Sequence, residues 1–135
     1  MQTQIERLMD GRIAVLSLSG DICQADSDIL RDVLADVFAA QPTPIFLIID
    51  ARHLRVSFQH LNAFMRQQRV TRSLENTYAT QLQLPPIYVG TSPLTETYVS
   101  IGLPHSFRMD RSPSFSTRDE AMDYVRVHQR RQAQA

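Results

Sequence analysis

The stretch that decides the fold is IFLIID, residues 45–50, the start of IFLIIDARHLRVSFQHLNAF (residues 45–64). Its five apolar residues lie between Pro44 and a carboxylate, a pattern typical of a short strand buried on both faces. We expect a central strand that ends at Asp50. The polar sequence after it predicts a turn over residues 52–57 and then a helix, in which Leu61, Phe64 and Met65 form the inner stripe.

Apolar runs and helical periodicities alternate on both sides of this strand. QIERLM and RIAVLSLS flank Asp10-Gly11, a dipeptide that favours a two-residue hairpin turn. Ser92-Pro93 begins a helix, because proline is favoured at the first helical position. Thr117 and Glu120 form a T-x-x-E capping box for the last helix. We predict strands at residues 4–9, 12–19, 45–50, 86–90 and 106–110, and helices at 26–40, 58–69, 92–101 and 117–131.

This β-β-α-β-α-β-α-β-α order predicts one α/β domain over residues 1–132, followed by a frayed tail at 133–135. Strands that alternate with helices favour a mostly parallel sheet, here of four or five strands, with helices on both faces. The first two strands add an N-terminal β-hairpin. The length of 135 residues is that of a single domain.

The composition excludes several chemistries. The 14 basic residues are all arginine, so there is no Schiff-base lysine, no lysine to anchor pyridoxal phosphate and no P-loop. Cys23 is the single cysteine, which rules out an intrachain disulfide and suits a reducing compartment. Its acidic neighbours disfavour a thiolate, so we interpret it as a packing residue. Without a signal peptide or a run of about 18 apolar residues, we expect a cytoplasmic protein with no membrane insertion.

Charge is segregated along the chain, although the formal net charge is zero. Residues 20–50 hold six aspartates and one arginine, whereas residues 51–73 hold five arginines and no acid. A neutral chain is not a general nucleic-acid binder, but the planar guanidinium pairs well with carboxylates. We therefore predict a surface that binds another protein with an acidic surface, or a second copy in a homodimer, through Arg52, Arg55, Ser57, Arg66 and Arg69.

Other positions have both a chemical and a structural interpretation. Asp50, Thr91 and Ser92 follow strands of the parallel sheet, at the edge where ligands of α/β sheets bind, so they are candidate ligand-binding residues. We favour a structural role for them, namely capping of turns and helices or, for Asp50, an ion pair with Arg52. His53, His60, His105 and His128 lack metal-ligand spacing, so we predict no metal site. We predict no cofactor and no catalytic residue.

Several local patterns, taken in order, resemble the anti-sigma-factor-antagonist superfamily of STAS and SpoIIAA-like domains. They are IAVLSLSGDI, the acidic helix after it, IFLIID with the next helix, PPIYVG, and FRMDRSPSFSTRDEAMDYV. The resemblance spans nearly the whole chain. It implies a non-enzymatic module that binds proteins in bacterial signalling.

The phosphorylation motif of that superfamily is where this sequence departs. STAS antagonists place a phosphorylatable residue in a D-S-[ST]-G-like turn before a helix, but here the turn reads Arg55-Val56-Ser57-Phe58. Ser57 matches that residue only loosely by position, and we favour its interpretation as the N-cap of the helix. The leading hypothesis is a protein-binding signalling or scaffold domain without a clear phospho-switch motif. The alternative is a small-ligand-binding α/β protein, or a weak enzyme, that uses the carboxyl ends of the parallel strands.

Overall fold

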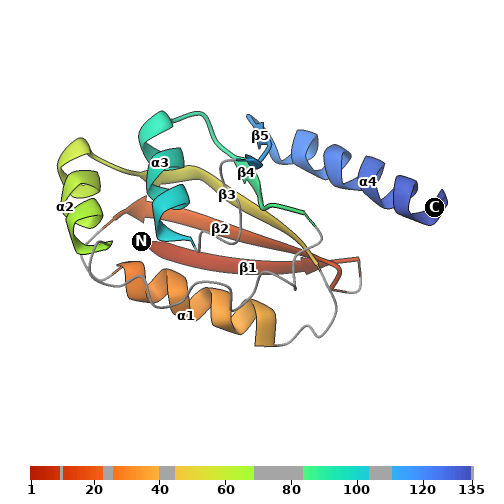
Figure 1. Cartoon of the computed structure of the whole chain (residues 1–135), viewed down its shortest axis with the longest axis horizontal. Coiled ribbons are helices and arrows are strands. Elements are labelled where there is room, and N and C mark those ends of the chain that lie inside the picture. The colour runs from red at the N-terminus through yellow and green to blue at the C-terminus, as the bar shows by residue number, and fades with distance from the viewer. Residues whose placement is uncertain (10, 23–25, 40–44, 69–83, 104–110, 135) are drawn as a thin grey trace.

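A computed structural model of the chain describes residues 1–9, 11–22, 26–39, 45–68, 84–103 and 111–134. Its five-stranded sheet has the order β1-β2-β3-β4-β5. The first pair, β1 (Gln2–Leu8) and β2 (Ile13–Asp21), is antiparallel, and all later pairs are parallel. These later strands are β3 (Phe46–Arg55), β4 (Ile87–Val89) and β5 (Ser114–Phe115). The predicted α/β fold with an N-terminal hairpin is confirmed (Figure 1).

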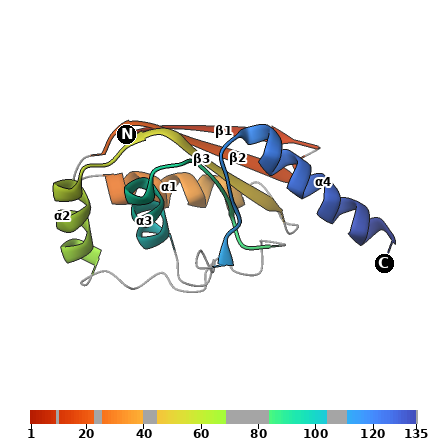
Figure 2. The same ribbon diagram turned by 90° about the horizontal axis from the view of Figure 1, so that it is seen from above.

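The four helices of the described residues cover the two faces of the sheet. One face carries α1 (Asp26–Ala39), α2 (Phe58–Gln68) and α3 (Pro93–Gly102), which lie on the same side in Figure 2. The opposite face carries α4 (Arg118–Gln134), which packs on the sheet through Ala121 and Val125. The sheet therefore separates a larger hydrophobic core from a smaller one.

Strand β3 supplies both cores, which explains its continuous apolar sequence. Leu47 and Ile49 are buried in the core beneath α1 and α3, whereas Phe46 and Ile48 are buried in the core beneath α4. Successive side chains of a strand point to opposite faces, so a strand covered on both sides has no polar face. The interpretation of IFLIID as a central strand is confirmed, since β3 is third in the order of five.

The prediction that this strand ends at Asp50 is wrong. β3 continues to Arg55, because a β-bulge lies between the pairs Ser17–Asp50 and Ser19–His53. The bulge places one extra residue in β3, so Arg52 and His53 are both exposed between the buried Ala51 and Leu54. Arg52 and Arg55 therefore belong to a strand and not to the predicted turn.

The hairpin loop and the end of α4 differ from their predictions, and one predicted strand is not tested. The hairpin has a four-residue loop over residues 9–12 rather than a two-residue turn, since Leu8 pairs with Ile13 and both Met9 and Gly11 have positive φ. The predicted strand at residues 106–110 lies outside the described residues, and the fifth strand of the described chain is Ser114–Phe115. Helix α4 extends to Gln134, three residues beyond its predicted end.

We expect Leu47→Ala and Ile48→Ala each to lower the free energy of unfolding by about 2–5 kcal/mol, because each opens a cavity in a different core. Val127→Ala is the control, since this side chain of α4 is 43% exposed and its truncation should cost little. Urea denaturation of the three variants measures the effect. A silent Ile48→Ala would mean that α4 does not cover the sheet.

Candidate functional site

The carboxylate of Asp50 is buried and bound to Arg52 from the same strand. Asp50 is 4% exposed. The Arg52 Nε donates to Oδ1 at 2.9 Å, Nη2 donates to Oδ2 at 2.8 Å, and the Arg52 backbone N–H donates to Oδ1 at 3.2 Å. Burial raises the pKa of this carboxyl, but the hydrogen bonds and charge of Arg52 outweigh burial and hold the pKa below its usual value. Both oxygens are therefore engaged in an ion pair, which is not the arrangement of a general base.

A second ion pair ties the start of α4 to the sheet beside Asp50. Arg118 Nη2 donates to Glu6 Oε2 at 2.8 Å, which links α4 to β1. The charge of Arg118 also contributes to the low pKa of Asp50. The two arginines and two carboxylates thus form one group, which we call the sheet ion-pair group (Glu6, Asp50, Arg52 and Arg118).

Arg55 pairs with an aspartate from the acidic half of the chain. Asp21 and Arg55 are partners in the β2–β3 register, and Arg55 Nε donates to Asp21 Oδ1 at 2.7 Å. The hydrogen bond and charge of Arg55 lower the pKa of Asp21. Both side chains are largely exposed, so the pair contributes little to stability. Folding therefore brings part of the segregated charge together within one chain.

Ser57 is the N-cap of α2. Its Oγ accepts a hydrogen bond from the His60 backbone N–H at 3.2 Å, and its carbonyl accepts one from the Leu61 N–H at 3.0 Å. The side chain is exposed, next to the end of β3. This geometry matches the capping interpretation of Ser57.

Helix α2 exposes two large apolar side chains. Phe58 is 70% exposed and Met65 is 46% exposed; seven residues apart, they lie on the same side of the helix. Leu61 is buried as predicted, but the prediction that Met65 belongs to the inner stripe is wrong. Arg66 is exposed one residue further along, and Arg69 and the side chain of Phe64 lie outside the described part of the chain. We call Phe58, Met65 and Arg66 the α2 surface, which sequence reasoning missed because helical periodicity alone assigned Met65 inward.

At the turn between β4 and α3, polar groups form hydrogen bonds within the chain. Ser92 Oγ accepts a hydrogen bond from the Thr95 N–H at 3.4 Å, and Pro93 has no N–H to offer a ligand. Thr95 Oγ1 donates to the Leu54 carbonyl at 3.3 Å, which joins α3 to the end of β3. Thr91 is exposed. Ser92 thus serves as a helix cap, and few free donors remain for an anion.

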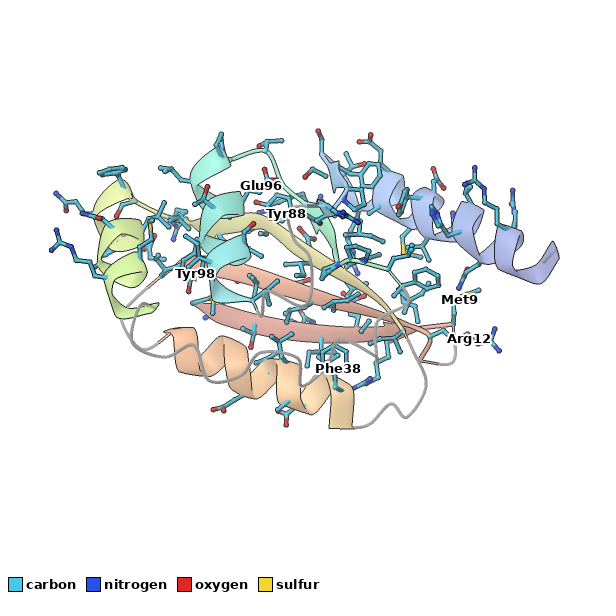
Figure 3. All side chains as sticks on the ribbon, in the orientation of Figure 1. Met9, Arg12, Phe38, Tyr88, Glu96 and Tyr98 are labelled. Atoms are coloured by element: carbon cyan, nitrogen blue, oxygen red, sulfur yellow. The ribbon has the colours of Figure 1, made fainter. Side chains whose placement is uncertain are left out.

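Tyr88 lies beneath this turn, next to Glu96 (Figure 3). Its ring is buried, and among the described residues its hydroxyl has no hydrogen-bond partner. Burial, together with the charges of Glu96 and Asp50, raises the pKa of Tyr88 to about 12. A Cβ on Gly90 would lie 2.8 Å from the Tyr88 hydroxyl oxygen, so glycine is required there by close approach.

The described histidines are dispersed. His53 and His60 are exposed, and His128 Nδ1 lies 3.2 Å from the Tyr124 carbonyl oxygen. His105 and Cys23 lie outside the described residues. In the part of the chain that the structure describes, no three His, Cys, Asp or Glu residues are grouped as metal ligands. None of the described helices is long and apolar enough to cross a membrane.

We expect Arg52→Met to lower the free energy of unfolding at pH 7 by about 1–3 kcal/mol, because it leaves a buried carboxylate unpaired. The expected loss of stability is modest because the Arg52 side chain is 35% exposed. Since the folded-state pKa of Asp50 is depressed, its stabilising contribution is present above the unfolded pKa of about 3.9 and is lost as the pH falls through the folded pKa. In Arg52→Met, burial instead favours the protonated carboxyl of Asp50. The difference in free energy of unfolding between variant and wild type should therefore become smaller toward pH 4.

Denaturation at several pH values measures this effect, with Asp50→Asn/Arg52→Met as control. The double variant has no unpaired buried charge, so at pH 7 it should be more stable than Arg52→Met alone. If the difference in free energy of unfolding between Arg52→Met and wild type were the same at every pH, the assignment of the Asp50–Arg52 ion pair would be contradicted.

We expect Gly90→Ala to cost about 1–3 kcal/mol through overpacking against Tyr88. Tyr88→Phe alone should be nearly neutral, because the hydroxyl it removes is unpaired within the described chain. In the Tyr88→Phe background the cost of Gly90→Ala should be smaller, since the nearest atom is gone. A double-mutant cycle measures the coupling, and additive costs would show that the two residues do not meet.

The sequence matches no protein-family model, and a comparison with curated proteins finds no match. Among solved structures, this chain is similar to an anti-sigma factor antagonist from Mycobacterium paratuberculosis, with a TM-score of 0.54, 21% identity and 93% of each chain covered. It is also similar to an uncharacterized protein of the DUF3478 family with a SpoIIAA-like fold from Shewanella loihica, with a TM-score of 0.51, 17% identity and 91% of each chain covered. These likenesses bear out the resemblance stated from the sequence at the level of the fold: this chain has the SpoIIAA-like α/β fold.

Proposed function

We propose that this chain is a non-enzymatic protein-binding module of a bacterial regulatory system, acting in the cytoplasm, and that the α2 surface is where its partner docks. The observation that carries the proposal is the exposure of Phe58 and Met65 on one side of α2. Aromatic residues, methionine and arginine are enriched in protein interfaces. The likeness of the fold to an anti-sigma factor antagonist, a protein whose name describes a regulatory role, supports the same class of function.

The apolar pair would supply the anchor of such an interface. A phenylalanine that is 70% exposed gains free energy when a partner covers it, at about 25 cal/mol per Å² of apolar area removed from water. Interfaces concentrate their binding energy in a few such residues near the centre of the contact. Phe58 and Met65 lie two helical turns apart, so the partner must offer apolar contacts along a strip of that length.

Arginines surround this anchor and suit a partner with acidic groups. Arg66 is exposed and holds no ion pair with another described residue. Arg55 lies at the end of β3, three residues before the start of α2. Its surface pair with Asp21 is weak enough to be exchanged for a partner's carboxylate. Arg52 stays outside the α2 surface because its guanidinium is held by Asp50. Arg69 remains a predicted contact, and Ser57 caps the helix beside the docking surface.

The alternative function, binding of a small ligand or weak catalysis at the strand ends, needs free polar groups there. Asp50 is held by Arg52, and Ser92 is held by the Thr95 N–H. Neither residue is available without breaking a contact within the chain. The observations therefore favour the protein partner.

We expect Phe58→Ser/Met65→Gln to weaken binding of the native partner at least about tenfold, which corresponds to about 1.4 kcal/mol. The partner is first captured on immobilised wild-type protein from the native cell and identified by mass spectrometry. Binding of the purified partner to wild type and variant is then measured by calorimetry. The variant should keep its fold, because both side chains are exposed.

The control is Met9→Gln, which removes another exposed apolar side chain outside the α2 surface and should leave the affinity unchanged. Binding should also weaken as salt rises if Arg55 and Arg66 meet acidic groups. Equal affinity of the wild type and of Phe58→Ser/Met65→Gln would remove the α2 surface from the interface.

A further inference from the structure

The C-terminal end of α4 projects from the domain. The helix runs for 17 residues, but its last buried side chain is Val125. Among the later residues whose side chains are described, 126 to 131, none is buried. Figures 1 and 2 both show this end extending beyond the sheet. Isolated helical turns are unstable in water, and most helices in proteins depend on packing of one face.

The outer side of this projecting end is basic. Arg126 and Arg130 are one turn apart on the side opposite Ala121 and Val125, and Arg131 follows. Arg130 and Arg131 hold no ion pair with another described residue. Arg126 pairs with Asp123 at 3.1 Å, but both side chains are well exposed, so this pair contributes little and can be exchanged. The negative end of the helix dipole explains why basic residues lie at the C-terminal end of α4. It does not explain why this end extends beyond the sheet.

The outer side of α1 carries the complementary charge. Asp32 and Asp36 are exposed and one turn apart, on the side opposite the buried residues Leu34, Val37 and Phe38. Neither carboxylate has an ion-pair partner within the described residues. Arg7 Nη2 donates to the backbone carbonyls of Asp36 and Val37, at 3.4 Å each, and not to the Asp36 carboxylate.

We propose that the projecting end of α4 binds the outer side of α1 in a second copy of this chain. Residues one turn apart are separated by about 6 Å along any α-helix, so the Arg126–Arg130 row matches the Asp32–Asp36 row in spacing and in sign. Val127, exposed on the same side of α4, adds apolar contact. The two rows do not meet within one chain, because α1 and the end of α4 lie at separate parts of the molecule in both views (Figures 1 and 2). Reciprocal exchange of the two contacts closes a twofold dimer.

Sedimentation velocity of the purified chain over a range of concentrations tests the proposal directly. We expect a dimer at low ionic strength that dissociates as salt rises, since contacts between exposed charges are screened. Arg126→Glu/Arg130→Glu should lower the association constant at least about tenfold, because it replaces attraction with repulsion. Asp32→Arg/Asp36→Arg should do the same from the other side.

Combining both pairs of substitutions in one chain should restore the dimer, because the swapped rows attract again. This rescue separates a lost contact from a frayed helix, since reversal at α1 cannot repair α4. The matched control is Arg66→Glu/Arg111→Glu, which changes the net charge equally at two exposed arginines outside both rows and should leave the dimer intact. A wild type that stays monomeric at low salt, or a quadruple variant that does not associate, would overturn the proposal.

The inference stands apart from the proposed function. The α2 surface contributes no residue to this contact, and the test needs only the purified chain. A monomeric chain that binds its partner through Phe58 and Met65 would overturn self-association and leave the proposed function standing.

Discussion

The parallel pairing of β2 with β3 is the interaction on which the rest of the structure depends. Its register places Val15 beside Ile48 on one face and Leu16 beside Ile49 on the other, so one pair of strands supplies both hydrophobic cores. A parallel pair needs a crossover between its strands, and α1 provides it on the face of the larger core. Once this pair has formed, α3 and α4 have apolar surfaces to cover, and the polar residues that follow along β3 have fixed neighbours.

The bulge near the end of this pair resolves a conflict in β3. Asp50 continues a strand that is buried on both faces, and a buried carboxylate is costly unless it is paired. The extra residue lets the strand continue with Arg52 and His53 outward while Leu54 returns to the core. Arg52 then reaches back to both oxygens of Asp50. The same register ends with Asp21 opposite Arg55, so a charge contrast that is strong along the sequence is partly balanced in space.

Sequence reasoning succeeded where local physics decides the outcome. IFLIID was identified as a central strand because a continuous apolar run is stable only when both faces are covered, and the starts of α3 and α4 were found within one residue because Ser92 and Thr117 are strong caps. The predictions from the sequence were wrong where the structure depends on how strands pair and how helices pack. Arg52, His53 and Arg55 interrupt any alternation, so no local pattern predicts that β3 continues through them. Whether Met65 points inward depends on how α2 packs on the sheet. The strand β5 has only two residues, Ser114 and Phe115, which is too few to show a periodic pattern.

The α2 surface proposed for the partner and the projecting part of α4 lie at opposite ends of the molecule (Figure 1). Between them, several polar side chains on the sheet are bound within the chain: Arg52 pairs with Asp50, Arg118 pairs with Glu6, and Thr95 donates to the Leu54 carbonyl. Because these polar groups are already paired, we expect the specificity of binding to come from the exposed apolar and arginine side chains at the two ends. The contacts proposed for the dimer use α4 and the outer side of α1 and include no residue of the α2 surface. A self-associated chain would therefore still present Phe58 and Met65, and a dimer would offer its partner two copies of the same docking surface. Divalent presentation of this kind raises the effective affinity for any partner that is itself paired or clustered, without a new contact.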